Sequence, residues 1–316
     1  MTHSSAPCTG RFAPSPTGEL HAGSLIAALG SFVDARAAGG RWLVRIDDLD
    51  PPRTQAGASA SILHTLEQHG LWWDEQPLYQ STRREAYAEA LRQLERDGAL
   101  YRCTCSRRDL VRAARRGPLG RIYPGTCRAR EVAADAVAAT RLRMPPGELR
   151  IHDHSHGPIT LDADRDVGDV VVLRRDRIPA YHLATTLDDA HLGVTAVVRG
   201  VDLLPAALVQ RAIQQTLALP ATEWRHLPLV RTATGVKLSK QTGAHPLDPE
   251  RPVAQLLDAW AVLGQAPPVD TPETPEAFLR WAVSAWQPQR IPADPQDRPG
   301  ADRSGPAASA TSGGVR

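Results

Sequence analysis

Two short segments of the sequence carry side chains suited to binding a nucleotide. The first is the loop of residues 11–24, which contains two prolines and a Thr-Gly pair before the step His21-Ala22-Gly23. Apolar residues at helical spacing follow, so we expect the loop to end at a helix N-terminus, where free N–H groups and the helix dipole favour phosphate. His21 adds a hydrogen-bond donor there. These residues alone fit an ordinary strand–loop–helix connection equally well.

The second segment holds the only lysines of the chain. Lys and Arg together number 37, and all but Lys237 and Lys240 are arginine. Both lysines lie in the pentapeptide Lys237-Leu238-Ser239-Lys240-Gln241. An ammonium group is a compact, mobile charge, which suits a phosphate that moves during a reaction. The alternative is chance clustering of two residues.

Three cysteines lie close enough in the sequence to share a metal ion. Cys103, Cys105 and Cys127 fall within 25 residues, and zinc in structural sites takes four ligands, with thiolate preferred. A fourth ligand is therefore needed, and imidazole binds zinc more readily than a phenol. The candidates are Tyr123, His152, His154 and His156. The alternative is that these thiols are free and buried.

The overall composition indicates a globular protein. The chain has 316 residues, of which 42% are hydrophobic and 23% charged, and no stretch approaches the length of about 20 apolar residues that spans a bilayer. The N-terminus has no signal-peptide pattern, so we expect a cytoplasmic protein without a membrane partner. Residues 101–130 contain nine arginines and one acidic residue, Asp109. This block is either a face that contacts nucleic-acid phosphates or a solvated arginine-rich surface.

The order of predicted elements is that of an α/β protein with a parallel sheet. Helices are expected over residues 21–38, 57–70, 82–97 and 205–219, with strands over 41–46, 169–173, 194–198 and 227–230. Thr82 and Glu85 suggest a capping box for the third of these helices. Residues 252–287 are expected to be helical, with Trp260, Trp281 and Trp286 as packing residues.

The predicted organisation is a nucleotide-binding sheet divided by an insertion. Acidic residues 47–50 follow the second strand, at the carboxyl edge where α/β folds bind ligands. The expected divisions are a disordered start at 1–10, a first half at 11–97, an inserted cysteine-containing part at 98–191, a second half with the lysine loop at 192–245, a helical part at 246–290 and a disordered tail at 291–316.

Together these segments resemble the class I aminoacyl-tRNA synthetases. His21-Ala22-Gly23-Ser24 is similar to their HIGH signature but lacks its last His, and residues 237–241 are similar to KMSKS with Leu and Gln as departures. Residues 11–18 and 45–50 resemble the glutamyl/glutaminyl subgroup, over about residues 11–263. Tyr181, residues 198–200 and Asp202 fit the same pattern.

The cysteine spacing and the short region after residue 241 resemble the glutamyl-queuosine tRNA(Asp) synthetases. This resemblance implies a Rossmann-like catalytic domain with an inserted zinc-containing subdomain, a short helical C-terminal part and no anticodon-binding domain. It implies one structural Zn²⁺ held by Cys103, Cys105, Tyr123 and Cys127. It further implies activation of L-glutamate by ATP with Mg²⁺, then transfer to queuosine of tRNA(Asp). The alternatives are a compact glutamyl-tRNA synthetase charging tRNA(Glu) and a non-catalytic paralogue. We expect a monomer.

The resemblance also implies roles for individual residues. Catalytic roles fall to His21, Lys237 and Lys240. Glutamate binding falls to Arg11, Phe12, Ala13, Pro14, Ser15, Asp47, Tyr181 and Arg199. ATP binding falls to Thr17, Gly18, His21, Gly23, Ser24, Lys237, Leu238, Ser239, Lys240 and Gln241. Arg11 and Arg199 would supply cations for the substrate carboxylate, Tyr181 a hydroxyl, and Asp47 an anion for the ammonium, one methylene shorter than the Glu expected there.

Overall fold

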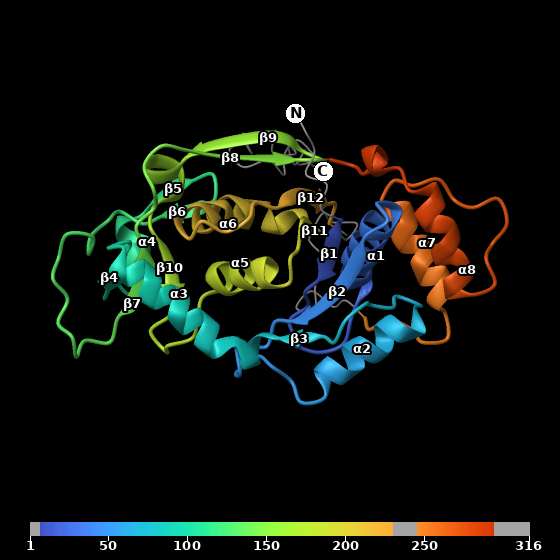
Figure 1. Cartoon of the computed structure of the whole chain (residues 1–316), viewed down its shortest axis with the longest axis horizontal. Helices are drawn as coiled ribbons and strands as arrows, with labels where there is room; N and C mark the ends of the chain where they lie inside the picture. The colour runs from blue at the N-terminus through green and yellow to red at the C-terminus, as the bar shows by residue number, and fades with distance from the viewer. Residues whose placement is uncertain (1–6, 230–244, 294–316) are drawn as a thin grey trace, which may run out of the picture.

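The computed structural model describes residues 7–229 and 245–293 of the chain (Figure 1). The predicted lysine loop, residues 237–241, lies outside the described residues. Within the described part, no helix is both long enough and apolar enough to cross a membrane.

Two groups of parallel strands form the centre of the molecule. In the first group, β1 pairs in parallel with β2, and β2 pairs in parallel with β3. In the second group, β11 pairs in parallel with β12, and β12 pairs in parallel with β8. Strand β8 also forms an antiparallel hairpin with β9. The two groups meet where β1 lies beside β11, since the backbone N–H of Thr195 donates to the carbonyl of Thr9 at 3.0 Å. The strands are β1 (Thr9–Phe12), β2 (Arg41–Ile46), β3 (Leu78–Tyr79), β8 (Glu148–Asp153), β9 (Gly157–Asp162), β11 (Ala196–Gly200) and β12 (Glu223–Leu227).

Helices cover these strands from both sides. In Figure 1, α5 and α6 lie to the left of β1 and β11, whereas α1, α7 and α8 lie to the right, and α2 runs below. The helices are α1 (Ala22–Ala37), α2 (Ala58–Gln68), α3 (Arg84–Arg96), α5 (Tyr181–His191), α6 (Leu204–Thr216), α7 (Pro252–Val262) and α8 (Pro275–Ala285), with short 3₁₀ turns at η1 (Gln80–Arg83), η3 (Val201–Leu203) and η5 (Pro288–Arg290). This layering confirms the predicted α/β class.

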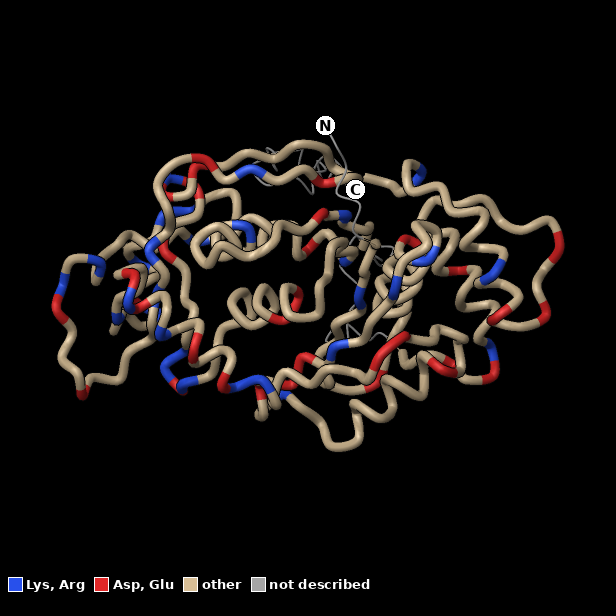
Figure 2. Tube along the Cα trace, in the orientation of Figure 1, with Lys and Arg blue, Asp and Glu red and all other residues tan. Residues whose placement is uncertain are grey.

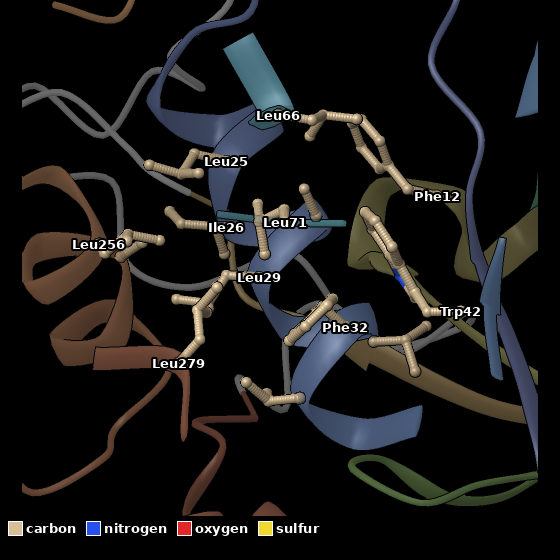
Figure 3. Close-up of a cluster of buried hydrophobic side chains, with 14 of the residues drawn as sticks. Phe12, Leu25, Ile26, Leu29, Phe32, Trp42, Leu66, Leu71, Leu256 and Leu279 are labelled. Atoms are coloured by element: carbon tan, nitrogen blue, oxygen red, sulfur yellow. The ribbon is translucent and has the colours of Figure 1, made fainter. Parts of the chain in front are cut away.

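The main hydrophobic core surrounds α1. Leu25, Ile26, Leu29 and Phe32 of this helix are buried, and they pack against Trp42 of β2 and against the C-terminal helices, as Figure 3 shows. Leu256 of α7 and Leu279 of α8 belong to the same cluster. Each fully buried side chain of this kind contributes about 1.5–3 kcal/mol. The core therefore holds the N-terminal end of α1, and with it the His21 loop, in place.

The tryptophans of the C-terminal helices are packing residues, as predicted. The Trp260 ring lies 5.3 Å from that of Trp281 and 5.7 Å from that of Trp286, centroid to centroid. Both helices pack on α1. The C-terminal helical part therefore helps to support the His21 loop.

The far end of the molecule is built from antiparallel strands. The sheet order is β10–β7–β4, beside a small hairpin, β5–β6. The elements are β4 (Leu100–Cys103), α4 (Arg107–Ala113), β5 (Arg115–Gly117), β6 (Gly120–Ile122), β7 (Ala139–Leu142), the π-helix η2 (Ala163–Val167) and β10 (Val170–Leu173). Residues 98–191 therefore build this end and also supply β8, β9 and α5 to the central layers.

Several predicted boundaries are wrong. Thr9 and Gly10 belong to β1 rather than to a disordered start, because Thr9 is buried and its N–H donates to the Thr195 hydroxyl at 2.9 Å. Ile291 is a buried core residue, not part of a tail. The strand expected at 227–230 instead spans Glu223–Leu227.

The predicted capping box of the third helix is also wrong. The helix α3 begins at Arg84 with Arg83 as its N-cap, and its N-cap makes no side-chain hydrogen bond. The hydroxyl of Thr82 instead donates to the carbonyl of Tyr79 within the preceding 3₁₀ turn. The extra turn moves the helix start beyond the reach of Thr82.

Candidate active site and cysteine cluster

The His21 loop ends at the N-terminus of α1, as the sequence predicts. His21 is the N-cap residue, and its Nδ1 accepts the backbone N–H groups of Gly23 at 3.1 Å and Ser24 at 3.4 Å. A ring nitrogen that accepts carries no proton, so in this tautomer the proton is on Nε2. The two N–H groups are thus engaged by the imidazole, and the donor that His21 can offer to a phosphate is Nε2–H.

The loop between β1 and α1 is held against the loop that follows β2. The N–H of Asp47 donates to Pro14 and that of Gln55 to Pro16, both at 2.9 Å. Gly18 has φ of 125°, a conformation that strains other residue types. These contacts bring the predicted ATP loop and the acidic residues after β2 to one edge of the sheet.

The chain returns to this loop after the segment that holds the lysines. Pro246 forms an isolated β-bridge with His21, and the N–H of Leu247 donates to the carbonyl of Leu20 at 3.1 Å. On the other side of residues 230–244 lies the end of β12. Residues 246 and 247, the described residues that follow the lysine segment, therefore lie beside the His21 loop, more than 200 residues earlier in the sequence.

Arg11 and Asp47 belong to a buried network of ion pairs. Arg11 Nε lies 3.0 Å from Asp189 Oδ1, which also accepts Arg45 Nη1 at 2.6 Å, and Arg45 Nε lies 2.6 Å from Asp47 Oδ1. Two cations and two anions alternate, so the network has no net charge. Burial raises the pKa of Asp189, but Arg11 and Arg45 outweigh it and hold that pKa below its usual value.

Arg199 has a different environment. Its Nε donates to His226 Nε2 at 3.1 Å, Nη1 to the Tyr181 hydroxyl at 3.4 Å and Nη2 to the carbonyl of Leu203 at 3.1 Å. The side chain is 5% exposed, and within the described residues no carboxylate forms an ion pair with it. Burial lowers the pKa of this guanidinium. A buried cation that no described carboxylate contacts directly favours the binding of an anion.

The other predicted glutamate ligands lie at or after the end of β1, or begin α5. The Phe12 side chain is buried and stacked on Trp42, with ring centroids 6.5 Å apart, so only its backbone can face a ligand. Tyr181 is the first residue of α5 and is 39% exposed. It therefore connects Arg199 to solvent.

Three thiols gather at the end of β4. The sulfur atoms of Cys103, Cys105 and Cys127 all lie within 4.8 Å of one another. The Tyr123 hydroxyl is 3.4 Å from Cys103 Sγ and 3.6 Å from Cys105 Sγ, and it accepts the N–H of Cys127 at 2.8 Å. Three sulfurs and one phenol oxygen around one point fit the four-ligand requirement of zinc.

The histidines that were alternatives for the fourth ligand have other partners. His156 Nδ1 lies 3.0 Å from Asp153 Oδ1, and His154 Nε2 lies 3.2 Å from Glu223. His152 contacts the ring of His154 at 5.4 Å, on the strand next to β12. In the described part of the chain, no histidine joins the cysteine cluster.

The Cys127 thiol is acidified by its neighbours. Burial raises its pKa, but hydrogen bonds with Tyr123 and the neighbouring backbone and thiols lower it to about 7. Metal binding requires thiolate, so this environment favours a bound cation.

A basic cavity lies between the cysteine cluster and the loop after β2. Its volume is about 890 Å³, and Cys103 and Cys105 form part of its wall. Charged side chains supply much of the remainder: Asp50, Arg53, Arg107, Arg141, Arg174, Arg175 and Asp176. Figure 2 shows Lys and Arg positions gathered at this end of the molecule, around α4 and β4–β7. Five arginines against two carboxylates make the cavity suitable for phosphate groups.

The partners of the predicted arginines are not among the residues predicted from the sequence. Asp189, Arg45, His226 and Asp153 are all at most 3% exposed, and each contacts a residue far away in the sequence or a predicted ligand. Two signals were available. Arg45 interrupts an apolar strand, and Asp188-Asp189 places two adjacent carboxylates in α5.

Comparison with known proteins identifies relatives over nearly the whole chain. Residues 8–250 match the family model of the class I tRNA synthetases (E and Q), catalytic domain. A protein of Thiobacillus denitrificans named glutamyl-Q tRNA(Asp) synthetase is 48% identical over 292 residues, which are 92% of this chain and 97% of that protein. A protein of Chromobacterium violaceum with the same name is 46% identical, again over 92% of this chain and 97% of the relative.

A solved structure has the same fold. The glutamate tRNA ligase of Elizabethkingia meningosepticum, determined in complex with its amino acid, superposes with a TM-score of 0.74 at 23% identity. The match covers 90% of this chain and 66% of the ligase, so the chain spans just under two thirds of that protein.

Proposed function

Since this chain belongs to the glutamyl-Q tRNA(Asp) synthetases, within the class I synthetase family, we propose that it activates L-glutamate with ATP and transfers it to queuosine of tRNA(Asp). The observation that carries the proposal is Arg199. It is a buried cation that lacks a carboxylate partner among the described residues and lies beside the partly exposed Tyr181. A substrate with a carboxylate would supply the missing charge.

In the proposed first step, the side-chain carboxylate of glutamate binds Arg199 and the Tyr181 hydroxyl. Arg11 contributes positive charge from one strand away, although Asp189 already holds its guanidinium. Asp47 accepts from Arg45, and its remaining lone pairs are available to the substrate ammonium. Ala13, Pro14 and Ser15 would line the same edge.

The chemical step forms a bond between the α-carboxylate oxygen of glutamate and the α-phosphorus of ATP, and pyrophosphate leaves with the electrons of the broken P–O bond. His21 Nε2–H would donate to the phosphates, with Thr17, Gly18, Gly23 and Ser24 beside it. The lysine loop, residues 237–241, would neutralise the leaving pyrophosphate through Lys237 and Lys240. Mg²⁺ bound with ATP would supply further charge to the phosphate oxygens.

In the proposed second step, a hydroxyl of queuosine attacks the activated carbonyl carbon, and the bond from that carbon to the phosphate oxygen breaks. AMP leaves with the electron pair of that bond, and the hydroxyl proton passes to the AMP phosphate or to water. The tRNA phosphates would contact the arginines of the 890 Å³ cavity and of the block at residues 101–130. This cavity opens between the loop after β2 and the cysteine cluster, so RNA bound there would be next to the β2 edge of the site.

We further propose that one zinc ion is held by Cys103, Cys105, Tyr123 and Cys127. The zinc ion would link β4 to the loop after β6 and so stabilise the wall of the basic cavity. Metal analysis of the purified protein should give about one zinc per chain, and Cys127→Ala should lose it. Binding of tRNA should weaken in this variant while glutamate activation stays within about twofold, because the cluster lies away from Arg199. Retention of zinc by the variant would contradict the ligand set.

The first test of the function is transfer of labelled glutamate to tRNA from cells with and without queuosine. Label only on queuosine-containing tRNA(Asp) is the expected result, with loss of acceptance after periodate cleavage of the diol. Equal labelling of queuosine-free tRNA(Glu) would instead identify a compact charging enzyme. Absence of glutamate-dependent exchange between ATP and pyrophosphate would identify a non-catalytic relative.

We propose that the protein acts as a cytoplasmic monomer. The large hydrophobic side chains exposed among the described residues come from segments far apart in the sequence: Trp72, Val111, Val137, Tyr181 and Val269. A mass measurement in solution tests this.

A further inference from the structure

Behind Arg199 lies a buried pair of side chains to which the proposed reaction assigns no role. His226 of β12 is the parallel partner of Arg199 on β11, and Asp153 ends the neighbouring strand β8. His226 Nε2 is 3.1 Å from Arg199 Nε, and His226 Nδ1 is 2.6 Å from Asp153 Oδ2. His226 and Asp153 are both fully buried. The three side chains form a row of hydrogen-bonded groups from the sheet interior to the candidate ligand site.

The hydrogen bonds among Arg199, His226 and Asp153 allow only one consistent assignment of donors and acceptors. A guanidinium only donates, so His226 Nε2 must accept and the ring proton must be on Nδ1, where it donates to Asp153. The other Asp153 oxygen accepts the N–H groups of Ser155 at 3.0 Å and His156 at 2.9 Å, and the His156 ring at 3.0 Å. Asp153 is therefore fixed in orientation, and it fixes the His226 tautomer.

The imidazole is neutral in this setting. Burial lowers the pKa of His226, and the charge of Arg199 lowers it further against the opposing effect of Asp153, to about 4. A carboxylate in the same place would hold the arginine equally well but would cancel its charge, as Asp189 does for Arg11. A neutral ring holds the guanidinium and leaves its charge for a ligand.

We propose that Asp153 and His226 are positioning residues that hold Arg199 in the orientation that binds the glutamate side-chain carboxylate, without neutralising it. The inference rests on the proposed function and names two residues that determine substrate affinity at that site. The hydrogen bond from His226 Nδ1–H to Asp153 fixes the orientation of the imidazole ring. His226 Nε2 then fixes the position of Arg199 Nε, and the Nη groups of Arg199 face Tyr181 and Leu203.

The test is the steady-state kinetics of glutamate-dependent exchange between ATP and pyrophosphate. His226→Leu removes the acceptor at similar volume, and we expect KM for glutamate to rise at least tenfold while KM for ATP stays within twofold. His226→Gln offers an amide oxygen to Arg199 Nε and should recover part of the affinity. A residue that only filled space would show no such recovery.

His69→Leu is the matched control. His69 is also fully buried and makes two side-chain hydrogen bonds, to Thr65 and Gln255, within the α2 and α7 region. The KM for glutamate of the His69→Leu variant should equal that of the wild type. Asp153→Asn is the second variant if His226→Leu fails to fold, and it should raise KM for glutamate by a smaller factor, since the amide still accepts from the ring.

The outcomes separate the two proposals. A wild-type protein without glutamate-dependent exchange would overturn the proposed function itself. An active wild type with an unchanged KM for glutamate in folded His226→Leu, or an equal rise in His69→Leu, would overturn the role of Asp153 and His226 alone.

Discussion

The two halves of the candidate site treat buried arginine in opposite ways. On the β1 and β2 side, Arg11 and Arg45 are neutralised by Asp189 and Asp47. On the β11 and β12 side, Arg199 is held by an imidazole, a phenol and a carbonyl, with no carboxylate among its described partners. The first arrangement joins β1 and β2 to α5 through Asp189, whereas the second leaves a positive charge for a ligand. Burial of an arginine is thus no guide to its role until its partners are known.

Removal of the shared carboxylate should have the largest effect. Asp189→Ala leaves Arg11 without its ion-pair partner and Arg45 with only Asp47, and breaking a buried pair in this way costs about 3–5 kcal/mol of unfolding free energy. Urea denaturation measures it. Asp176→Ala, which removes an exposed partner of Arg174, should change stability by less than about 1 kcal/mol. Similar losses in the two variants would remove the distinction between buried and exposed pairs.

Replacement of Arg199 should have the opposite pattern. Arg199→Met removes a buried cation that no described carboxylate contacts directly, so we expect stability to be unchanged or higher. Glutamate-dependent exchange should fall at least 100-fold, which corresponds to about 2.7 kcal/mol of transition-state stabilisation. Exchange kinetics and urea denaturation on the same preparation measure both. A loss of stability as large as that of Asp189→Ala would show that Arg199 is a structural residue as well.

The most gradual expected effect is a pH dependence of stability on the β12 side. The pKa of His226 is lowered to about 4, below that of an unfolded histidine at about 6.5, so the unfolded chain binds more protons between these values. Its contribution to stability is complete above pH 6.5 and is lost as the pH falls towards 4, by up to about 1.4 kcal/mol per pH unit.

This pH dependence is measured by denaturation at several pH values in the wild type and in His226→Leu. The charged or titratable groups around the ring are Asp153, Arg199 and His156, and the variant leaves all three in place. The slope should be shallower in the variant. Equal slopes of stability against pH in the two proteins would show that a group other than His226 causes the pH dependence.

Local sequence patterns predicted the helices and strands of the fold. They did not predict the contacts between strands that are distant in the sequence. Apolar spacing and a short loop predicted α1 with His21 at its start, and the structure confirms both. The Thr82 capping box failed because a 3₁₀ turn precedes α3, and a sequence pattern does not distinguish the two. The resemblance pointed to Arg11 and Arg199 alike. Their different partners, Asp189 and His226, are 178 and 27 residues away and became visible only with the strands in place.

The position of β1 beside β11 has a consequence for how the protein folds during synthesis. Thr9 contacts Thr195, 186 residues later in the chain. At a synthesis rate of about 5–20 residues per second, the first strand emerges roughly 10–40 seconds before its neighbour exists. During that interval β1 can pair with β2 and pack on α1, but Arg11 has no Asp189 to pair with. The candidate glutamate site is therefore completed late, when most of the chain has left the ribosome.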